Sequence, residues 1–412
     1  MSFADEAASL EEDLVQLRRA LHREPEIGLD LPRTQEKVLR ALDGMPLEIT
    51  LGQKTTSVTA VLRGTAPAMS SPTSSNPSGQ APAVLLRADM DALPVQERTG
   101  VAYTSHVDGA MHACGHDLHT AMLVGAARLL NEQRDRLAGD VVFMFQPGEE
   151  GWDGASVMVD EGVLEASGRR ADAAYGLHVF SALMPGGQFV TKPGTMLAAS
   201  GALTVTVVGA GGHGSAPHLA NDPVTVVAEM ITSLQTMVTR RFDVFDPVVV
   251  TVGVLSAGSR RNIIPETASF EATVRSFSAR SRERLVDAIP RLLHGIAAAH
   301  GAQAEVRYED EYPVTVNNPD ETAFAAATIT EVFGDQQHAQ LAAPLSGSED
   351  FSRVLARVPG SFVGLGATPV GADPHTAPFN HSPYAVFDDA VLASGAALYA
   401  ELATRRLALL TP

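Results

Sequence analysis

The stretch His112-Ala113-Cys114-Gly115-His116-Asp117-Leu118-His119 is unusually rich in side chains that can bind a metal ion. Its eight positions hold three imidazoles, one carboxylate and the only cysteine of the protein. Because a single thiol cannot close an intramolecular disulfide, Cys114 needs another role. A thiolate two residues from a histidine, among so many ligand-type side chains, is typical of a metal site. A buried free cysteine beside surface histidines is the alternative, but the cluster as a whole favours metal.

The size and charge of the chain narrow its class. Its 412 residues exceed the usual limit of one hydrophobic core, so we expect two domains. Lys and Arg number 30 against 48 Asp and Glu, and the net charge of −18 disfavours nucleic acid and anionic membrane as partners. Residues 1–13 are acidic and lack the features of a signal peptide, and no stretch approaches the roughly 20 apolar residues of a membrane span. With a single cysteine, these features predict a cytoplasmic protein.

Three short apolar runs, each followed by ligand-type side chains, indicate a βαβ-type sheet. Between the first two runs, residues 121–130 are apolar enough for a buried helix. In open α/β sheets, ligands gather outside the carboxyl ends of the strands, so we expect the side chains that follow the runs to meet. The runs and these residues are 84–87 with Asp89 and Asp91, 140–145 with Glu149 and Glu150, and 171–177 with His178.

The N-terminal part of the chain holds simpler signals. Apolar residues at helical spacing predict a helix over 10–21. The apolar runs 58–62 and 83–86 are typical of strands. Residues 65–83, which join them, are rich in Pro, Ser, Ala and Gly, and this composition indicates a long exposed loop.

The pattern changes near Ala199 to that of a second, smaller domain. Strands and helices follow in a β-α-β-β-α-like order over roughly 110 residues, which indicates a compact inserted α+β domain. Asn221 or Asp222 is expected to cap the first helix, with Pro223 in its first turn. The predicted elements are strand 202–208, helix 222–238, strands 247–255 and 267–276, and helix 281–300.

Adjacent carboxylates follow the second apolar run. Glu149 and Glu150 come directly after a Gln-Pro-Gly turn. One carboxylate of such a pair can bind a metal ion while the other faces a water molecule as a general base. A solvated acidic turn is the alternative, but such a turn does not need to be positioned by a buried strand.

Two isolated histidines extend the candidate ligand set. His178 follows a short apolar run and His381 sits in a polar turn, where either alone is more often structural. With Cys114, His116 and one glutamate they supply five ligands, which is more than one tetrahedral ion needs. A bridged pair of ions about 3.5–4 Å apart would use the surplus. Mixed Cys, His and carboxylate donors suit Zn, Mn, Co or Ni and do not select among them.

The inserted segment carries two polar features of its own. Residues 209–218 form a glycine-rich stretch with two histidines, but it lacks the Gly-Lys-Ser/Thr ending of a phosphate loop. A neutral imidazole there could polarise a substrate carbonyl, and a strand-to-helix turn explains the segment equally well. Asn262, before Ile263-Ile264-Pro265, could bind a substrate or stabilise a turn.

Taken in order, these motifs resemble those of the M20 metallopeptidases. Within that family they resemble the amidohydrolase branch of N-acyl-amino-acid, hippurate and auxin-conjugate hydrolases. The motifs run across most of the chain, and the cysteine-containing cluster is quite specific for this branch. They stand at residues 87–94, 112–119, 146–151, 176–178, 211–213, 262–265, 347–351 and 381–383.

The resemblance implies an α/β fold with two domains. A zinc-peptidase-like catalytic domain, with a mixed sheet flanked by helices, would comprise 1–198 and 313–412. An inserted ferredoxin-like α+β lid would comprise 199–312. Such lids often mediate dimerisation, so a homodimer or homotetramer is expected. Relative to the family, the loop at 65–83 looks like an insertion.

The resemblance also implies the roles of single residues. Glu149 would be the general base, and His213 would stabilise the oxyanion, in the active site of a partner subunit. Asn262 would hold substrate, and Asp91 would orient a metal ligand without binding the ion itself. No role follows for Asp89, His112, Asp117 or His119. The ligands of two divalent ions would be Cys114, His116, Glu150, His178 and His381.

The implied reaction is metal-dependent hydrolysis of the amide bond of a small N-acyl amino acid, giving a carboxylic acid and a free amino acid. The ions would lower the pKa of a bridging water, and Glu149 would take its proton. A dipeptidase or aminopeptidase acting on short peptides is one alternative. A metal-binding homologue without catalysis is the other.

Overall fold

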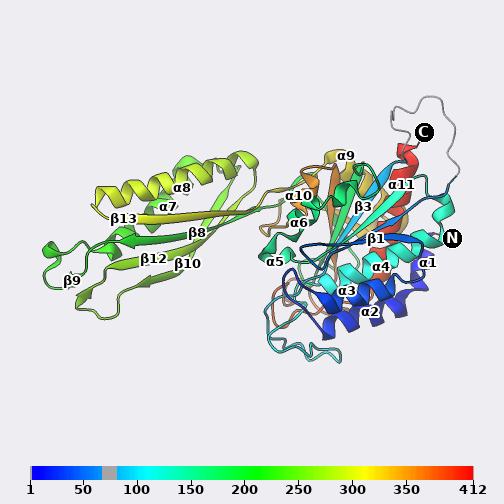
Figure 1. Ribbon diagram of the computed structural model, residues 1–412, viewed down its shortest axis with the longest axis horizontal. Helices are drawn as coiled ribbons and strands as arrows, with labels where there is room; N and C mark the ends of the chain where they lie inside the picture. The colour runs from blue at the N-terminus through cyan, green and yellow to red at the C-terminus, as the bar shows by residue number, and fades with distance from the viewer. Residues whose placement is uncertain (1, 67–80, 412) are drawn as a thin grey trace. The chain divides into compact units, whose positions relative to one another are not determined.

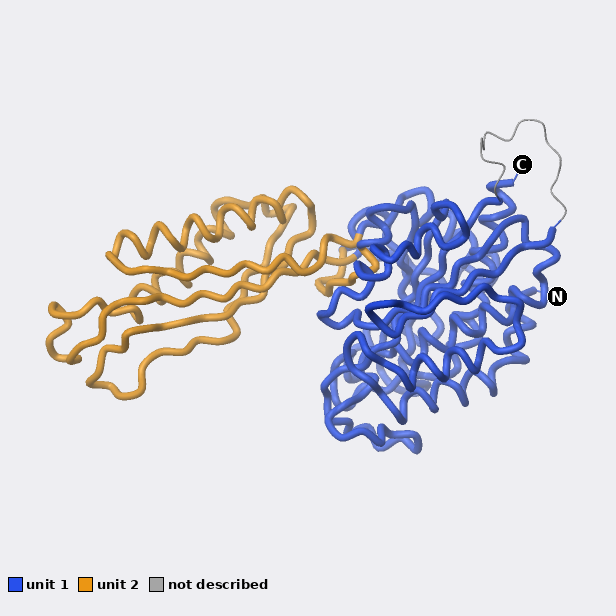
Figure 2. The backbone as a smooth tube through the Cα atoms, in the orientation of Figure 1, with its two compact units in different colours: residues 1–196, 316–343, 353–412 blue, residues 197–315, 344–352 orange. Residues whose placement is uncertain are grey.

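The computed structural model describes residues 2–66 and 81–411 of the chain. The expected loop at 65–83 therefore lies largely outside the described residues. The chain forms two compact units, coloured separately in Figure 2. Unit 1 comprises Met1–Met196, Val316–Ala343 and Arg353–Pro412, and unit 2 comprises Leu197–Thr315 and Pro344–Ser352.

Unit 1 is built on a mixed sheet of eight strands (Figure 1). The strand order is β1-β2-β4-β3-β5-β16-β6-β15, and β4, β3, β5 and β16 run parallel to one another. The bounds are β1 Leu47–Leu51, β2 Val58–Leu62, β3 Ala83–Asp89, β4 Asp140–Gln146, β5 Ala173–Phe180, β6 Phe189–Thr191, β15 His338–Gln340 and β16 Gly360–Gly366. Two short strands, β7 (Gly194–Leu197) and β14 (Thr315–Asn317), contain points where the chain passes between the units.

The central strands are continuous apolar runs because both faces of the sheet are covered. Every residue of β3, β4 and β16 is buried. The predicted strand over 58–62 matches β2, and the run at 140–145 matches β4. The helices of unit 1 are α1 Phe3–Ala8, α2 Glu11–Arg23, α3 Pro32–Ala41, α4 His116–Glu132, α5 Glu149–Trp152, α6 Gly154–Asp160, α9 Pro319–Phe333, α10 Ser352–Leu355 and α11 Val391–Leu410, with 3-10 turns at Arg134–Arg136, Val163–Glu165 and Asp335–Gln337.

The buried helix α4 packs directly against α11. Gly395 of α11 faces Met122 of α4, and a Cβ added at Gly395 would lie 1.9 Å from the Met122 sulfur. Only glycine therefore allows the two helices to approach so closely here. Both helices also contact β3, so this pair fixes the strand that ends in Asp89.

Two of the predicted element boundaries that were wrong lie beside the site. The buried helix begins at His116, five residues earlier than predicted, so the first turn of α4 contains His116, Asp117 and His119. Strand β5 extends to Phe180 because its pairing with β16 continues, and His178 lies opposite Gly364 within the ladder. His178 is therefore a strand residue and does not follow the strand.

Unit 2 contains a four-stranded antiparallel sheet in the order β10-β12-β8-β13, with the helices α7 and α8 (Figure 1). This β-α-β-β-α-β order is ferredoxin-like, as predicted. Leu203, Val205 and Val207 of β8 are buried in a core shared with both helices, while intervening threonines point away. The bounds are β8 Ala199–Val208, β9 Gly212–His213, α7 Pro223–Arg241, β10 Val248–Ala257, β11 Ile263–Ile264, β12 Thr267–Ser276, α8 Ala279–Ala299 and β13 Gln303–Tyr312, with a 3-10 turn at Pro217–Leu219.

The capping of α7 is decided by the structure. Asp222 caps the helix, because its side chain accepts a hydrogen bond of 2.9 Å from the Val224 N–H. Pro223 occupies the first helical turn, as predicted. Among the described residues, no helix is both long and apolar enough to cross a membrane.

Tyr399 of α11 ties two strands together behind the site. Its buried hydroxyl accepts a hydrogen bond of 2.8 Å from the Leu177 N–H of β5 and donates one of 2.5 Å to the Arg87 carbonyl of β3. We expect Tyr399→Phe to lower the free energy of unfolding by about 1–3 kcal/mol, because buried polar groups lose their partner. Urea denaturation measures this, and the exposed Tyr384→Phe is the matched control. Equal midpoints for both variants would contradict this role.

Candidate metal centre

The five predicted ligands come together where β3, β4 and β5 end. The ligand atoms of Cys114, His116 and His178 lie within 4.8 Å of one another, and so do those of Cys114, Glu150 and His381. The two groups share the thiol, so they form one cluster of five potential ligands, which is more than one tetrahedral ion needs. His178 Nε2 is 3.5 Å from Cys114 Sγ, and His381 Nε2 is 3.1 Å from Glu150 Oε1.

A glycine brings the thiol and the first imidazole to this place. Gly115 has φ +84° and precedes α4, so the chain turns between Cys114 and His116 in the left-handed region. A Cβ at Gly115 would lie 2.3 Å from a methyl group of Val179. Both the backbone conformation and the packing therefore require glycine here.

Asp91 fixes the turn that carries the two glutamates. Its Oδ1 accepts a hydrogen bond of 2.9 Å from the Glu149 N–H, and its Oδ2 accepts one of 3.0 Å from the Glu150 N–H. The same carboxylate lies 3.6 Å from His116 Nδ1. Asp91 thus contacts three neighbours of the cluster at once, which suits the predicted orienting role.

His178 is held in the form that a metal ligand needs. Its Nδ1–H donates to the Val179 carbonyl at 2.9 Å, which leaves the lone pair of Nε2 toward Cys114. Burial holds the pKa of His178 well below its usual value, so the imidazole is neutral. A neutral ring with a fixed tautomer is ready to bind a cation.

His381 reaches the cluster from a loop, in a left-handed conformation with φ +72°. Its backbone N–H donates to the Ala113 carbonyl at 2.8 Å, which joins this loop to the cysteine segment. Hydrogen bonds to Cys114 and Glu150 raise the pKa of His381 to about 10. A metal ion that takes this nitrogen therefore displaces a proton.

Asn380, beside His381, is a structural residue of the site that sequence reasoning missed. Its amide donates to the Cys114 carbonyl at 3.2 Å and to the Val179 carbonyl at 3.0 Å. Its Oδ1 accepts a hydrogen bond of 3.0 Å from the Ser181 N–H. One side chain thus joins three segments that supply ligands, and only its position next to His381 hinted at this.

The chemistry of the cluster fits a metal. Both ring nitrogens of His116 are buried and make no hydrogen bond within the described chain. Such orphaned polar atoms are costly unless another partner binds them. Thiolate, imidazole and carboxylate donors together match a divalent transition ion.

His119, three residues after His116, has a different role. His119 Nδ1–H donates to Asp89 Oδ1 at 2.5 Å, and its Nε2 accepts a hydrogen bond of 2.8 Å from the Val179 N–H. Both ring nitrogens are therefore occupied, although His119 also groups with Asp89 and His116. Arg87 contacts Asp89 at 2.6 Å as well. His119 and Asp89 thus fix the ends of β3 and β5 beside the ligands.

Asp117 forms a buried ion cluster on the other side of α4. Its Oδ2 lies 2.9 Å from Arg18 Nε and 2.7 Å from His22 Nδ1. Burial alone would raise the pKa of Asp117, but Arg18 and His22 hold it well below its usual value. His112 lies nearby, and burial lowers its pKa to about 3. These residues anchor the segment on which Cys114 and His116 sit.

Glu149 lies beside the predicted ligands but belongs to neither of the two groups of ligand atoms that share Cys114. A carboxylate oxygen of this buried residue lies within 4.8 Å of ligand atoms of His116 and Glu150. The φ/ψ of Glu150 is non-helical, so the two neighbouring carboxylates follow different backbone directions. This arrangement allows one glutamate to bind metal and the other to exchange protons.

The predicted residues of unit 2 lie together. His213 of β9 pairs with Ile263 of β11, and the Gly214 N–H donates to the Asn262 carbonyl at 2.9 Å. The Ser215 N–H donates to His213 Nδ1 at 3.2 Å. The Ser215 hydroxyl lies 2.8 Å from the same nitrogen. When Nδ1 accepts these bonds, the proton of a neutral ring lies on Nε2, which is then a hydrogen-bond donor.

Comparison with known proteins agrees with this geometry. Residues 85–405 match the model of peptidase family M20/M25/M40. The chain is 35% identical to thermostable carboxypeptidase 2 of Saccharolobus solfataricus over 97% of each chain. It is 37% identical to IAA-amino acid hydrolase ILR1-like 4 of Arabidopsis thaliana, over 96% of this chain and 86% of the relative. The crystal structure of Bacillus subtilis YxeP, a dinuclear metal-binding peptidase, superposes with a TM-score of 0.80 at 31% identity, covering 97% and 99% of the chains.

The fold and the cluster define a hydrolase of amide or peptide bonds that uses two divalent metal ions. The chain belongs to the peptidase family M20/M25/M40. The resemblance seen in the sequence is thereby confirmed, as are the α/β fold and the need for two metal ions. The mixed thiolate, imidazole and carboxylate donors suit Mn, Zn, Co or Ni, as predicted from the sequence.

The ligand assignment predicts the metal content of variants. We expect Cys114→Ala or His178→Ala to bind fewer than two ions per chain, because each removes a donor that the other side chains do not replace. Elemental analysis by mass spectrometry after gel filtration measures the stoichiometry. His375→Ala, which removes an exposed histidine, is the control and should keep two ions. Two ions in every variant would contradict the assignment.

Proposed function

We propose that this protein is an N-acyl-amino-acid amidohydrolase that acts on small substrates in the cytoplasm. The carrying observation is the buried Glu149 beside a cluster of Cys114, His116, Glu150, His178 and His381. The similarity to an IAA-amino acid hydrolase supports an acyl amino acid as the substrate. The similarity to a carboxypeptidase supports a second candidate, a short peptide.

In the proposed reaction, each residue of the site has its own role. Two bound divalent ions supply a Lewis acid and an activated water. The Glu149 carboxylate takes the proton of the attacking water and passes it to the nitrogen of the leaving amine. Asp91 keeps Glu149 in place through the backbone hydrogen bond at 2.9 Å. His178 and His381 present ring nitrogens from a strand and a loop, and Glu150 completes the set.

His213 and Asn262 are proposed to serve the substrate from unit 2, the lid. The Nε2–H of His213 is suited to donate a hydrogen bond to the oxyanion, because Nδ1 accepts from the Ser215 N–H. The Asn262 side chain is suited to hold the substrate. We further propose a homodimer or homotetramer in which His213 acts in the partner subunit's site. Residues 1–198 and 313–412 would then form the catalytic domain and 199–312 the lid.

The substrate class is tested with the stripped protein after reloading with Mn, Zn, Co or Ni. The panel holds N-acetyl, N-benzoyl and indole-acetyl amino acids together with dipeptides. We expect metal-restored release of the free amino acid from the acylated compounds, with slower cleavage of dipeptides. Faster cleavage of dipeptides would favour the peptidase alternative. No cleavage at two ions per chain would favour a metal-binding homologue without catalysis.

The role of the general base is tested by Glu149→Gln. We expect kcat to fall by about 10²–10⁴-fold, because the amide cannot accept the water proton. Metal content should stay at two ions per chain, since Glu150 and not Glu149 is the proposed ligand. The exposed Glu132→Gln is the control and should keep full activity. A variant that loses metal together with activity would make Glu149 a ligand.

The proposed role of His213 across subunits is tested by mixing two inactive variants. Glu149→Gln and His213→Ala chains are combined, unfolded mildly and reassembled. If His213 serves the partner's site, mixed dimers contain one complete site, and about a quarter of wild-type activity returns. If His213 serves its own site, no activity returns. Each variant reassembled alone is the control.

A further inference from the structure

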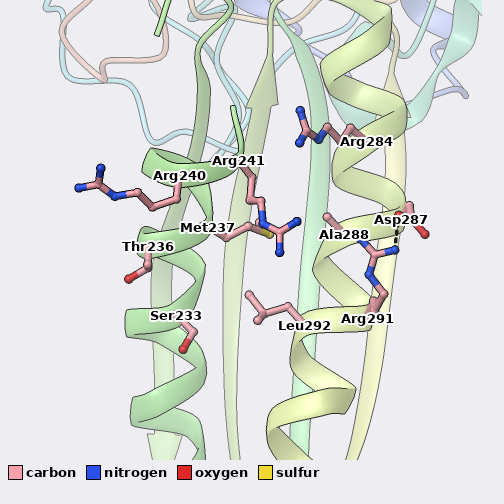
Figure 3. Close-up of a pocket in the computed structure, with 10 residues that line it drawn as sticks. All are labelled: Ser233, Thr236, Met237, Arg240, Arg241, Arg284, Asp287, Ala288, Arg291 and Leu292. Atoms are coloured by element: carbon pink, nitrogen blue, oxygen red, sulfur yellow. Dashed lines mark ion pairs between the residues drawn. The ribbon is translucent and has the colours of Figure 1, made fainter. Parts of the chain in front are cut away.

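Helices α7 and α8 of unit 2 border an open cavity of about 410 Å³ that none of the catalytic residues lines (Figure 3). This volume lies within the range of small-molecule sites. The cavity is lined by Ser233, Thr236, Met237, Arg240, Arg241, Arg284, Asp287, Ala288, Arg291 and Leu292. Four of these ten residues are arginines, in a protein whose net charge is −18.

Three of the four arginines have no acidic partner within the described chain. No carboxylate there lies within ion-pair distance of Arg240, Arg241 or Arg284, whereas Arg291 pairs with Asp287. Figure 3 shows the Arg241 side chain in the space between the helices and the Arg284 side chain extending from α8 toward α7. Arg284 also lies over the ring of Phe242, with its guanidinium carbon 5.3 Å from the ring centroid. This cation–π contact restricts the Arg284 side chain.

The other charged residues that line the cavity leave its net charge positive. Arg291 pairs with Asp287 at 3.0 Å, and both are exposed. Arg240 extends from the outer side of α7 and carries a further positive charge (Figure 3). The cavity is thus lined by four arginines and one aspartate, with the Arg240 guanidinium directed away from the space between the helices. Such a local excess of positive charge attracts a multivalent anion, against the repulsion from the net negative charge of the chain.

The floor of the cavity is not charged. Met237, Ala288 and Leu292 provide an apolar surface, and the hydroxyl groups of Ser233 and Thr236 border it on α7. Guanidinium groups bind phosphate oxygens in pairs, as Arg does at many phosphate sites. An apolar floor suits the ring or chain that carries the phosphate.

We propose that this cavity, the arginine groove of α7 and α8, binds a small organic phosphate such as a nucleotide. Arg241 and Arg284 contact the phosphate oxygens, and Met237 and Leu292 contact the apolar part of the ligand. The site is separate from the metal-ligand cluster in sequence and in chemistry. It would make the lid a receptor for a second small molecule.

The test uses the full-length, metal-loaded protein and mant-ADP, a fluorescent derivative of ADP. Fluorescence anisotropy should show saturable binding that weakens with added NaCl, because the contacts are ionic. In Arg241→Ser/Arg284→Ser, the dissociation constant of mant-ADP should rise at least about tenfold, because the charge-assisted hydrogen bonds from both guanidinium groups to the phosphate are lost. Competition with unlabelled ADP and with citrate then separates phosphate from carboxylate ligands.

The matched control removes two arginines elsewhere. Arg170 pairs with Glu165 on unit 1, and Arg307 lies on β13 at an exposed position of the strand. Arg170→Ser/Arg307→Ser makes the same change in net charge and should bind mant-ADP within about twofold of wild type. Circular dichroism and metal content of both double variants show that they are folded and loaded.

Several outcomes would overturn the proposal. Absence of saturable binding would do so, as would equal weakening in both double variants, which indicates a general charge effect. Unchanged binding in Arg241→Ser/Arg284→Ser would place the nucleotide elsewhere, for example at the metal ions. Sedimentation with phosphatidylserine vesicles without mant-ADP binding would make the groove a membrane contact. Dissociation of an oligomer in this variant, again without mant-ADP binding, would make it a subunit interface.

Discussion

The site depends on one carboxylate that binds two consecutive backbone amides. Asp91, just beyond β3, accepts hydrogen bonds from the N–H groups of Glu149 and Glu150 beyond β4. Because both bonds go to the backbone, they fix the turn whatever the two glutamate side chains do. The parallel pairing of β3 with β4 brings the two strand ends to one edge, and Asp91 sets the spacing there. A ligand and a base can then differ in role although they are neighbours in sequence.

The other predicted ligands are positioned by contacts of a similar kind. Gly115 turns the chain into α4, His119 joins β3 to β5, and Asn380 ties the loop of His381 to both the cysteine segment and the end of β5. Each of these residues satisfies buried polar groups of the backbone. The donors are thus held before any ion binds, which reduces the entropy lost on binding.

Sequence reasoning predicted much of this site because its signals are local. Apolar runs located the central strands, and ligand-type residues at their ends predicted where the cluster forms. Boundaries were harder: β5 extends past His178 because of its pairing with β16, which no local pattern reveals. Asn380 was missed for the same reason, since its partners are 199 to 266 residues away in the chain. Roles that depend on long-range contacts require the fold.

The topology of unit 2 has a consequence for how such proteins change over evolutionary time. The first and last strands of its four-stranded sheet, β8 and β13, pair directly, with Ser200 opposite Tyr312. The two ends of the inserted segment are therefore about one strand spacing apart, near 5 Å. Gaining or losing the whole segment would require no rearrangement of the sheet that holds the metal ligands. The inserted segment Leu197–Thr315, which makes up most of unit 2, is in this sense a detachable module that can diverge while the metal-ligand cluster is kept.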